Sequence, residues 1–401
     1  MLGLSFQSLS WISYLLQPGP NPNPDSNATT GAPALYNVFA QNTFIPSSFD
    51  MQLHRATDLG EAPDGSFVIG AHLASAPGDV DAAPRLPIAM PGRWAVVLDA
   101  LSVDGKPFDF ATSVVPGVPS GKIAAVIDSG FTFPPIPPAA VDFIYGGMPG
   151  AVFNQQGGNW IVPCNATADV VFTFGGVDFP MHYLDITYIF FSEAEVNGQF
   201  MNLTYCSNTF TRNQASSIDS VDANLGDPFM RNAYVSFNFN GLTPTGENSY
   251  MQMLPTTNFS AALPDFQASR AQTLASLPPE LPPAEFLAAL HGQSASPSDL
   301  ITSHVFDAPP VTATAPSSQN ASSVGSSATA LTMTNGSTVS AASVASGDLS
   351  SPTSSGGPSA STAAGNGGSQ TNAADHGPCV FWAGYLFAPF ALGFLSVTFV
   401  W

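Results

Sequence analysis

The sequence predicts a mostly-β fold over residues 1–262, followed by a proline-rich linker, a disordered stalk and an apolar C-terminal run. Short apolar runs of strand length recur between turn residues, and the chain contains 35 Gly and 37 Pro, which favours strands and turns over long helices. Hydrophobic residues make up 44% of the 401 residues, enough for a sizeable core. After residue 310 the composition changes abruptly.

Residues 1–85 mix short apolar runs with turn residues, and residues 86–262 hold most of the strand-like segments. In the first stretch, Ala32–Gln41 is predicted to be a short helix and Phe67–His72 a strand. In the second stretch, glycine pairs separate the apolar segments and indicate tight turns. The clearest predicted strands there are Trp94–Leu98, Ala124–Ile127, Val170–Phe174 and Tyr234–Phe239.

Two polar stretches follow the β-rich region. Residues 263–310 are rich in proline and are predicted to be a linker with one weak helical patch at Ala284–His291. Residues 311–378 contain 26 Ser or Thr and no aromatic residue, Lys or Arg. Such a composition cannot bury a core, so we expect a disordered stretch, which secretion would convert into an O-glycosylated stalk.

Residues 379–401 form a run of 23 residues without a charge, long enough to span a bilayer. No basic residue follows the run, whereas a stop-transfer helix normally has a positive cytoplasmic flank. We therefore expect a cleaved signal for a glycosylphosphatidylinositol anchor, with Asn366–Gly368 as the attachment triplet and residues 369–378 as the polar spacer. A plain membrane helix is the alternative, and a buried core helix is the least favoured one.

The charge balance excludes some partners. The chain has 8 Lys plus Arg against 28 Asp plus Glu, a net charge of −20. Nucleic-acid binding through a basic face is excluded because phosphate neutralisation needs Lys and Arg. Electrostatic docking on anionic lipid is disfavoured for the same reason. The balance fits a secreted protein that works in acid, where carboxylates become protonated and repel one another less.

Cysteine and histidine positions favour a disulfide over a metal site. Cys164 and Cys206 lie in the region predicted to fold, so we expect one disulfide between them, while Cys379 begins the apolar run. The six His are scattered, and neither a C-x-x-C nor an H-E-x-x-H pattern occurs. No metal or cofactor is therefore predicted.

Six N-glycosylation sequons occur and, with the predicted disulfide, favour the secretory pathway. Residues 1–18 have no basic start and no clean cleavage site, so no signal peptide is predicted and we expect that a start is missing. The sequon residues are Asn27, Asn165, Asn202, Asn258, Asn320 and Asn335.

One motif points to catalysis. Asp128, Ser129 and Gly130 follow the apolar strand that begins at Ala124. An Asp in such a turn can be held by backbone N–H groups and a neighbouring hydroxyl, while Gly lets the chain fold back and leaves the carboxylate facing a cleft. The D-[ST]-G triplet alone is a weak signal, because a structural Asp in a turn is its usual explanation.

The order of further elements makes the signal specific. After the D-S-G triplet come V-P-C, F-G-G, a second cysteine and L-G-D-P-F-M-R-N before a final strand, an order that resembles the C-terminal lobe of the pepsin-like aspartic endopeptidases. Segments near the N-terminus resemble the second half of that family's N-terminal lobe, so the resemblance covers about residues 1–245. The segments are Met1–Phe6, Phe39–Gln41, Phe49–His54, Trp160–Cys164, Val170–Gly176, Cys206 and Asn224–Asn232.

The resemblance implies a bilobal fold in which residues 1–85 are the remnant of an N-terminal lobe and residues 86–262 are the C-terminal lobe. The stalk and anchor resemble those of fungal surface proteases of this family, which implies an extracellular place at the cell surface or in the cell wall. The implied activity is endoproteolysis of polypeptides at acid pH, without a cofactor, through a water activated by two Asp carboxylates.

The resemblance implies that Asp128 is catalytic and that Ser129, Gly130 and Thr132 support it. Phe131 departs from the family pattern, which commonly has Thr or Ser there. The departure removes a hydrogen bond that would otherwise tune the acidity of Asp128.

One half of the implied catalytic pair is absent from the sequence. No second D-[ST]-G occurs, and the family's first catalytic Asp and flap Tyr would precede the element that is here Met1–Gly3. We therefore expect an N-terminally truncated chain that is inactive as it stands, because Asp128 has no partner with which to share a proton. We also expect a monomer, because the half lobe would obstruct twofold pairing of two Asp128 residues. The alternative function is that of a non-catalytic pseudo-peptidase, a binding protein at the cell surface or in the wall.

Overall fold

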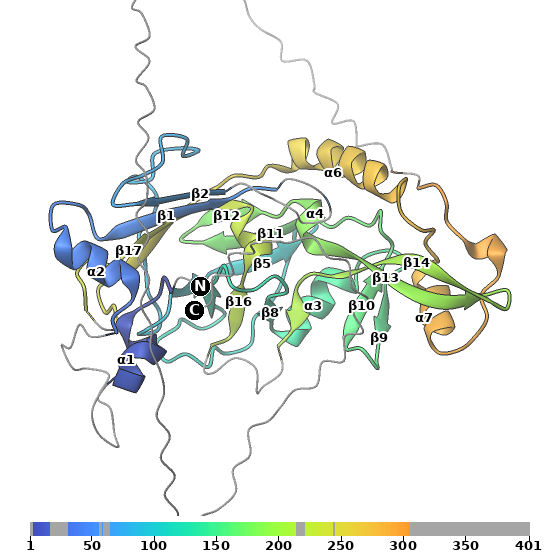
Figure 1. Ribbon diagram of the computed structural model, residues 1–401, viewed down its shortest axis with the longest axis horizontal. Helices are drawn as coiled ribbons and strands as arrows, with labels where there is room; N and C mark the ends of the chain where they lie inside the picture. Colours follow the sequence, from blue (N-terminus) through green and yellow to red (C-terminus); the bar gives the residue numbers. More distant parts are fainter. Residues whose placement is uncertain are drawn as a thin grey trace, which may run out of the picture. The chain divides into compact units, whose positions relative to one another are not determined.

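The computed structural model describes residues 3–16, 31–55, 58, 65–213, 221–243, 245–304 and 306, which belong to one compact unit (Figure 1). The predicted stalk at 311–378 and the apolar run at 379–401 lie outside the described residues. The sequon residues Asn27, Asn320 and Asn335 also lie outside them. The structure therefore tests the β-rich region and the proline-rich stretch that follows it.

The N-terminal part contributes short helices and two strands. The predicted helix at Ala32–Gln41 is confirmed as α2, Ala34–Gln41, which buries Leu35, Tyr36 and Phe39 on one face. The predicted strand at Phe67–His72 is present as β2, Gly65–Ile69. Before α2 lie the short helices η1, Gln7–Leu9, and α1, Trp11–Leu16.

A five-stranded sheet joins the beginning of the chain to its middle. Its order is β2-β1-β17-β18-β3, and β1 pairs antiparallel with both β2 and β17. Phe49 of β1 stacks on its register partner Phe237 of β17, with 4.5 Å between the ring centroids. Hydrogen bonding thus runs across the boundary predicted after residue 85. The added strands are β1, Ser48–Leu53; β17, Ala233–Asn238; β18, Tyr250–Pro255; and β3, Leu86–Pro87.

A three-stranded sheet carries the D-S-G triplet. Its central strand β7, Ile123–Ile127, is buried at all five positions. The strand β4, Ala95–Leu98, pairs with β7 antiparallel, and β16, Ala223–Leu225, pairs with it parallel. Because β7 has a neighbour on each side and both of its faces are covered, its C-terminal end is held in a fixed position.

The other sheets contain antiparallel strands of 2 to 10 residues and one parallel pair. Their orders are β12-β11-β5-β6, β13-β14-β10-β9 and β15-β8. The strands are β5, Ala100–Val103; β6, Lys106–Pro107; β8, Pro135–Ile136; β9, Val152–Asn154; β10, Asn159–Val162; β11, Val170–Phe174; β12, Val177–Pro180; β13, Thr187–Val196; β14, Gln199–Asn208; and β15, Thr211–Arg212. Short helices between them are α3, Pro138–Tyr145; α4, Tyr183–Ile186; and α5, Asp227–Met230.

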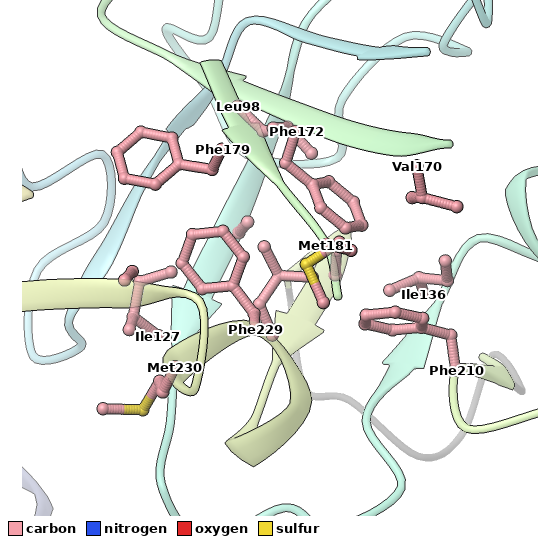
Figure 2. Packing of buried hydrophobic residues seen from close by; sticks show 14 of the residues in the cluster. Leu98, Ile127, Ile136, Val170, Phe172, Phe179, Met181, Phe210, Phe229 and Met230 are labelled. Carbon is pink, nitrogen blue, oxygen red and sulfur yellow. The ribbon is translucent and has the colours of Figure 1, made fainter. Parts of the chain in front are cut away.

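Phenylalanine rings fill the core between these sheets. Figure 2 shows Phe229 of α5 among Phe172, Phe179 and Ile127, and its ring centroid lies 5.9 Å from that of Phe172 and 5.7 Å from that of Phe179. All four side chains are at most 1% exposed. Their packing fixes α5 against β7 and β11, since protein interiors are close-packed and resist displacement of one element.

The predicted disulfide is present and joins Cys164 to Cys206. Cys206 belongs to β14, and Cys164 follows β10, its neighbour in the sheet. Both residues are fully buried. The bond closes a loop with a sequence separation of 42 residues, which by the loop-entropy model stabilises the fold by about 3–4 kcal/mol.

The proline-rich stretch at 263–310 differs from the prediction of a linker with one weak helical patch. The patch is present as α7, Pro283–Leu290, but a 16-residue helix, α6, Phe259–Leu274, crosses the predicted start of the linker, and a short η2, Pro297–Asp299, follows later. The sequence does not predict α6, because this helix contains Pro264 and buries only a narrow stripe of residues. The stripe consists of Ala262, Phe266, Arg270 and Leu274, spaced four residues apart.

Arg270 attaches α6 to the β domain. Its side chain is 0% exposed, and its Nε donates to Asp58 Oδ2 at 2.6 Å. Its Nη1 donates to the carbonyl oxygen of Cys164 at 2.8 Å and to Thr187 Oγ1 at 3.2 Å. One buried guanidinium therefore links α6, the disulfide region and β13.

Replacing Arg270 by Gln should destabilise the protein strongly, because the Asp58 carboxylate would remain buried without its cation. Breaking a buried pair by removing one partner typically costs about 3–5 kcal/mol. Urea unfolding should show the loss as a lower midpoint, whereas Gln272→Ala, at an exposed position of the same helix, should change it little. Equal midpoints for the two variants would show that Arg270 does not hold α6 in place.

Candidate active site

Asp128 lies at the point where β7 ends in a tight turn. Its backbone N–H donates to the carbonyl oxygen of Leu225 at 3.1 Å, and its own carbonyl oxygen accepts from Phe131 N–H at 3.4 Å. Opposite the turn, a Cβ on Gly226 would lie 1.9 Å from the Phe131 carbonyl oxygen, so only glycine fits there. The close approach of the two loops leaves Asp128 4% exposed.

Two hydrogen bonds hold the Asp128 carboxyl group. Gly130 N–H donates to Oδ1 at 2.9 Å, and Asn224 Nδ2 donates to Oδ2 at 3.2 Å. Gly130 belongs to the predicted triplet, whereas Asn224 comes from the parallel neighbour β16. One oxygen is thus oriented by a donor in the turn and the other by a donor on β16, which restricts rotation of the carboxyl group.

Burial dominates the acidity of this group. It raises the pKa of Asp128 to about 6, against the opposing effects of the Gly130 and Asn224 hydrogen bonds and of the Arg93 charge. Burial likewise raises the pKa of Asp227, the first residue of α5, to about 6. Arg231 opposes that second shift, and the negative charge of Asp128 adds to it. Two carboxyl groups that hold protons in mild acid therefore influence each other.

The predicted supporting residues behave differently from one another. Gly130 bonds to Asp128, but Ser129 Oγ is buried and has no hydrogen-bond partner among the described residues. Thr132 is exposed, and in the described part of the chain it does not hydrogen-bond to the Asp128 carboxyl group. Phe131, at the position that departs from the family pattern, is 37% exposed.

A cavity of about 540 Å³ opens beside the turn and begins at Phe131. Its wall is partly aromatic, and it contains the Arg212 guanidinium, which lies over the Phe153 ring and 3.2 Å from Asp142. Apolar cavities with a few polar groups are typical of side-chain binding sites. The lining residues include Phe131, Phe133, Pro135, Pro138, Phe153 and Arg212.

No second carboxyl group hydrogen-bonds to Asp128 among the described residues. Within the same part of the chain, no group of three His, Cys, Asp or Glu could hold a metal ion. None of its helices is both long enough and apolar enough to cross a membrane. Among the described residues, the hydrogen-bond partners of the Asp128 carboxyl group are Gly130 and Asn224.

Two of the three described sequons present exposed asparagines, Asn202 on β14 and Asn258 before α6, while Asn165 is partly buried. Asn258 Oδ1 accepts from the backbone N–H groups of Ser260 at 2.9 Å and Ala261 at 3.3 Å, and so caps α6. The cap uses only the amide oxygen, which is compatible with a glycan on the amide nitrogen.

Sequence reasoning missed two polar neighbours of Asp128. Asn224 was recognised only as part of the L-G-D segment, and Arg93 was not singled out at all. Their roles depend on the pairing of β16 and β4 with β7. The only signal in the sequence was their polarity beside otherwise apolar strands.

Comparison with known proteins gives one family. The family model described as eukaryotic aspartyl protease matches residues 2–243. Over 171 residues the chain is 30% identical to the aspartic-type endopeptidase ctsD of Aspergillus fumigatus, an alignment that covers 42% of this chain and 31% of that protein.

Two further relatives match at lower identity. A probable aspartic-type endopeptidase CTSD of Trichophyton verrucosum is 24% identical over 217 residues, which cover 54% of this chain and 37% of the relative. A probable aspartic-type endopeptidase of Arthroderma benhamiae is 28% identical over 121 residues, 30% of this chain and 29% of the relative. The chain thus spans about a third of the length of these relatives.

Replacing Asp128 by Asn should make the stability of the fold depend less on pH. Because the folded-state pKa is raised, Asp128 contributes full stability below its unfolded pKa near 4, and that contribution is lost as the pH rises through about 6. A neutral Asn removes the loss, so the variant should be more stable than the native chain at pH 7, by up to about 3 kcal/mol for a shift of two units.

At pH 4 the native chain and this variant should have nearly equal stability in urea unfolding. Asp109→Asn, at an exposed carboxylate, is the matched control and should show no such difference between the two pH values. If Asp128→Asn changed stability equally at pH 4 and pH 7, the buried carboxyl group would not be the source of the pH dependence.

Proposed function

The chain belongs to the eukaryotic aspartyl protease family, and we propose that it is an aspartic-type endopeptidase component in which Asp128 supplies one of two catalytic carboxylates. The observation that carries the proposal is the buried Asp128 carboxyl group at the end of β7, held by Gly130 and Asn224. A carboxyl group that retains its proton up to about pH 6 suits proton transfer in acid. The relatives' printed names support the same activity.

In the proposed reaction two carboxyl groups share one proton around a water molecule, because two adjacent like charges cannot both be ionised. The ionised member takes a proton from the water, and the protonated member polarises the carbonyl group of the scissile peptide bond. Within this chain, Gly130 and Asn224 orient the two oxygens of Asp128, and burial favours its protonated form. The substrate is a polypeptide, and the cavity beside Phe131 accepts one of its side chains.

The second carboxylate is the part of the site that this sequence does not contain. Asp128 belongs to the only D-[ST]-G triplet among the 401 residues. Asp227, which begins α5, acts on Asp128 only through its charge, because no hydrogen bond joins the two carboxyl groups in the described residues, so we do not propose it as the missing group. The buried hydroxyl of Ser129, which has no partner among the described residues, supports a site completed by another loop, since such groups normally find partners. We therefore propose that the 401 residues alone do not hydrolyse peptides.

The alternative, a non-catalytic binding protein of the cell surface or wall, is favoured by the same single triplet. The two functions differ in what happens when a second lobe is supplied. A chain extended upstream by a lobe that carries its own D-[ST]-G triplet should hydrolyse peptides if the first proposal is right. It should remain inactive if the protein is a pseudo-peptidase.

The activity test uses a quenched fluorescent peptide between about pH 3 and pH 6, the range in which carboxyl groups titrate. The 401-residue chain should give background rates, and the extended chain should turn over the peptide. Asp128→Asn in the extended chain should lower turnover by at least roughly 10²–10⁴-fold, the usual worth of general acid–base catalysis. Asn keeps the size of the side chain but cannot exchange the proton.

Two results would contradict this assignment. Robust turnover by the 401-residue chain, lost in Asp128→Asn, would mean that one lobe is sufficient or that two chains pair. Turnover by the extended chain that survives Asp128→Asn would exclude Asp128 from the mechanism. Asp109→Asn serves as the control for loss of an exposed carboxylate.

We also propose that the protein passes through the secretory pathway and is displayed extracellularly as a glycoprotein on a stalk. The disulfide and the exposed sequons Asn202 and Asn258 support this route. The stalk is proposed for residues 311–378 from their composition, and a lipid anchor from the apolar run at 379–401.

Mass spectrometry of the mature surface protein should detect glycans at Asn202 and Asn258 and a C-terminal peptide that ends near Asn366. The peptide should end there because attachment of a lipid anchor removes the apolar run that follows. Recovery of a peptide that contains Val400–Trp401 would instead favour a membrane helix.

A further inference from the structure

Strand register places two polar side chains beside Asp128. In the β4–β7 pair Ala95 lies opposite Val126, and Ile127 N–H donates to the Trp94 carbonyl oxygen at 2.9 Å. The same register continued by one residue puts Arg93 opposite Asp128. Directly opposed residues of antiparallel strands have side chains on the same face, so Arg93 and Asp128 share the face on which Ala95 and Val126 pack together.

The third strand brings Asn224 to that face from the other side. In the parallel pair of β16 with β7, Asn224 lies in register with Val126, and its Nδ2 reaches Asp128 Oδ2 at 3.2 Å. Asp128 is therefore flanked by a guanidinium from the β4 side and a carboxamide from the β16 side. The Arg93 charge is close enough to act on the ionisation of Asp128.

Arg93 is an unusual cation in this protein. It is half-buried, and none of the hydrogen bonds, ion pairs or ring contacts in the described residues satisfies its guanidinium. Six of the eight basic residues have such partners, and Lys106, the other exception, is fully exposed on β6. The partnered residues are Arg55, Arg231, Lys122, Arg212, Arg270 and Arg85.

Asn224 also retains unused hydrogen-bonding capacity. Its side chain is 4% exposed, and its Oδ1 is buried without a partner among the described residues. Most buried polar atoms are paired, so an unpaired acceptor beside a catalytic carboxyl group indicates a missing donor. A peptide N–H is such a donor, and a substrate backbone that passes Asp128 carries one at each residue.

We propose that Arg93 and Asn224 form a polar subsite beside Asp128 that selects a substrate side chain bearing a carboxylate. This inference rests on the proposed function, because it assumes that a polypeptide is bound across Asp128. Arg93 pairs with the Glu or Asp side chain of the substrate, for which a guanidinium offers two parallel N–H donors. Asn224 Oδ1 accepts an N–H of the substrate backbone. Arg93 is a specificity-determining residue in this scheme and takes no part in proton transfer.

The subsite is suited to mild acid. A substrate Glu is ionised above about pH 4.3, while Asp128 retains its proton up to about pH 6. Between these limits the substrate carboxylate meets the Arg93 cation and a neutral Asp128. The neighbouring Asp227, whose pKa is also raised to about 6, adds little repulsion in this range.

The test measures equilibrium binding, which needs no turnover. Two series of otherwise apolar octapeptides are compared, in which one position at a time carries either Glu or Gln. Each peptide is titrated into the 401-residue chain at pH 5 up to millimolar concentration, and binding is followed by NMR. Glu at one position should bind at least about 10-fold more tightly than Gln, as expected for a charge-assisted hydrogen bond. The Arg93 Nε–H signal should shift with that peptide. Equal binding of the two peptide series, or no binding of either, would overturn the proposal.

Variants assign the preference to Arg93. Arg93→Gln should abolish the difference between Glu and Gln peptides, and Arg93→Lys should retain part of it. Arg85→Gln removes the same charge at an exposed residue that lies over the Tyr250 ring and should leave the preference unchanged. A Glu preference that persists in Arg93→Gln, or that disappears in Arg85→Gln, would contradict the assignment.

These outcomes are separable from those of the proposed function. An extended chain that hydrolyses peptides without any Glu preference overturns only the polar subsite. A chain that prefers Glu peptides through Arg93 but stays inactive when a second lobe is supplied overturns only the endopeptidase assignment and favours the binding-protein alternative.

Discussion

The pairing of β7 with β4 on one side and β16 on the other is the constraint on which the site depends. The antiparallel neighbour β4 begins at Ala95, opposite Val126 and two residues before Asp128, and the parallel neighbour accepts the Asp128 N–H through Leu225. The Gly226 backbone can then approach Phe131 more closely than any Cβ would allow. Phe229, packed among Phe172 and Phe179, holds the adjacent helix α5 in place. A side chain at the end of β7 is thus positioned by three strands and a packed core.

That arrangement leaves several polar groups beside Asp128 without a partner among the described residues. Ser129 Oγ and Asn224 Oδ1 are buried without partners among the described residues, and the guanidinium of Arg93 has none there. Arg270 in the core is paired with Asp58, Cys164 and Thr187, but six other buried atoms of the described residues also lack a partner, among them Asp58 Oδ1 and Glu280 Oε2. Unsatisfied groups cost free energy and persist where function requires them. The location of Ser129, Asn224 and Arg93 beside Asp128, rather than their lack of partners alone, is the physical argument for substrate and a second loop at this face.

The sequence predicts local features of this protein well and register-dependent ones poorly. The turn at Asp128, the strand before it, the helix α2 and the disulfide were predicted, because each follows from a short motif or from two isolated cysteines. The neighbours of Asp128 could not be predicted, because Arg93 and Asn224 reach it only through the pairing of β7 with two strands distant in the chain. The helix α6 was missed because it contains Pro264 and because its narrow buried stripe includes an arginine.

A buried carboxyl group with a raised pKa also occurs in the region beyond the family match. Glu280, which follows α6, is 2% exposed, and burial raises its pKa to about 7 against the opposing effects of the Cys164 N–H bond and the Arg270 charge. Its Oε1 accepts from Cys164 N–H at 3.0 Å, while Oε2 lies 3.5 Å from His304 Nδ1 without a hydrogen bond. Like Asp128, Glu280 binds its proton more tightly in the folded state, so both contributions to stability are complete in acid and are lost as the pH rises through about 6 to 7. The groups that hold the C-terminal helices and the group proposed for catalysis therefore favour the same pH range.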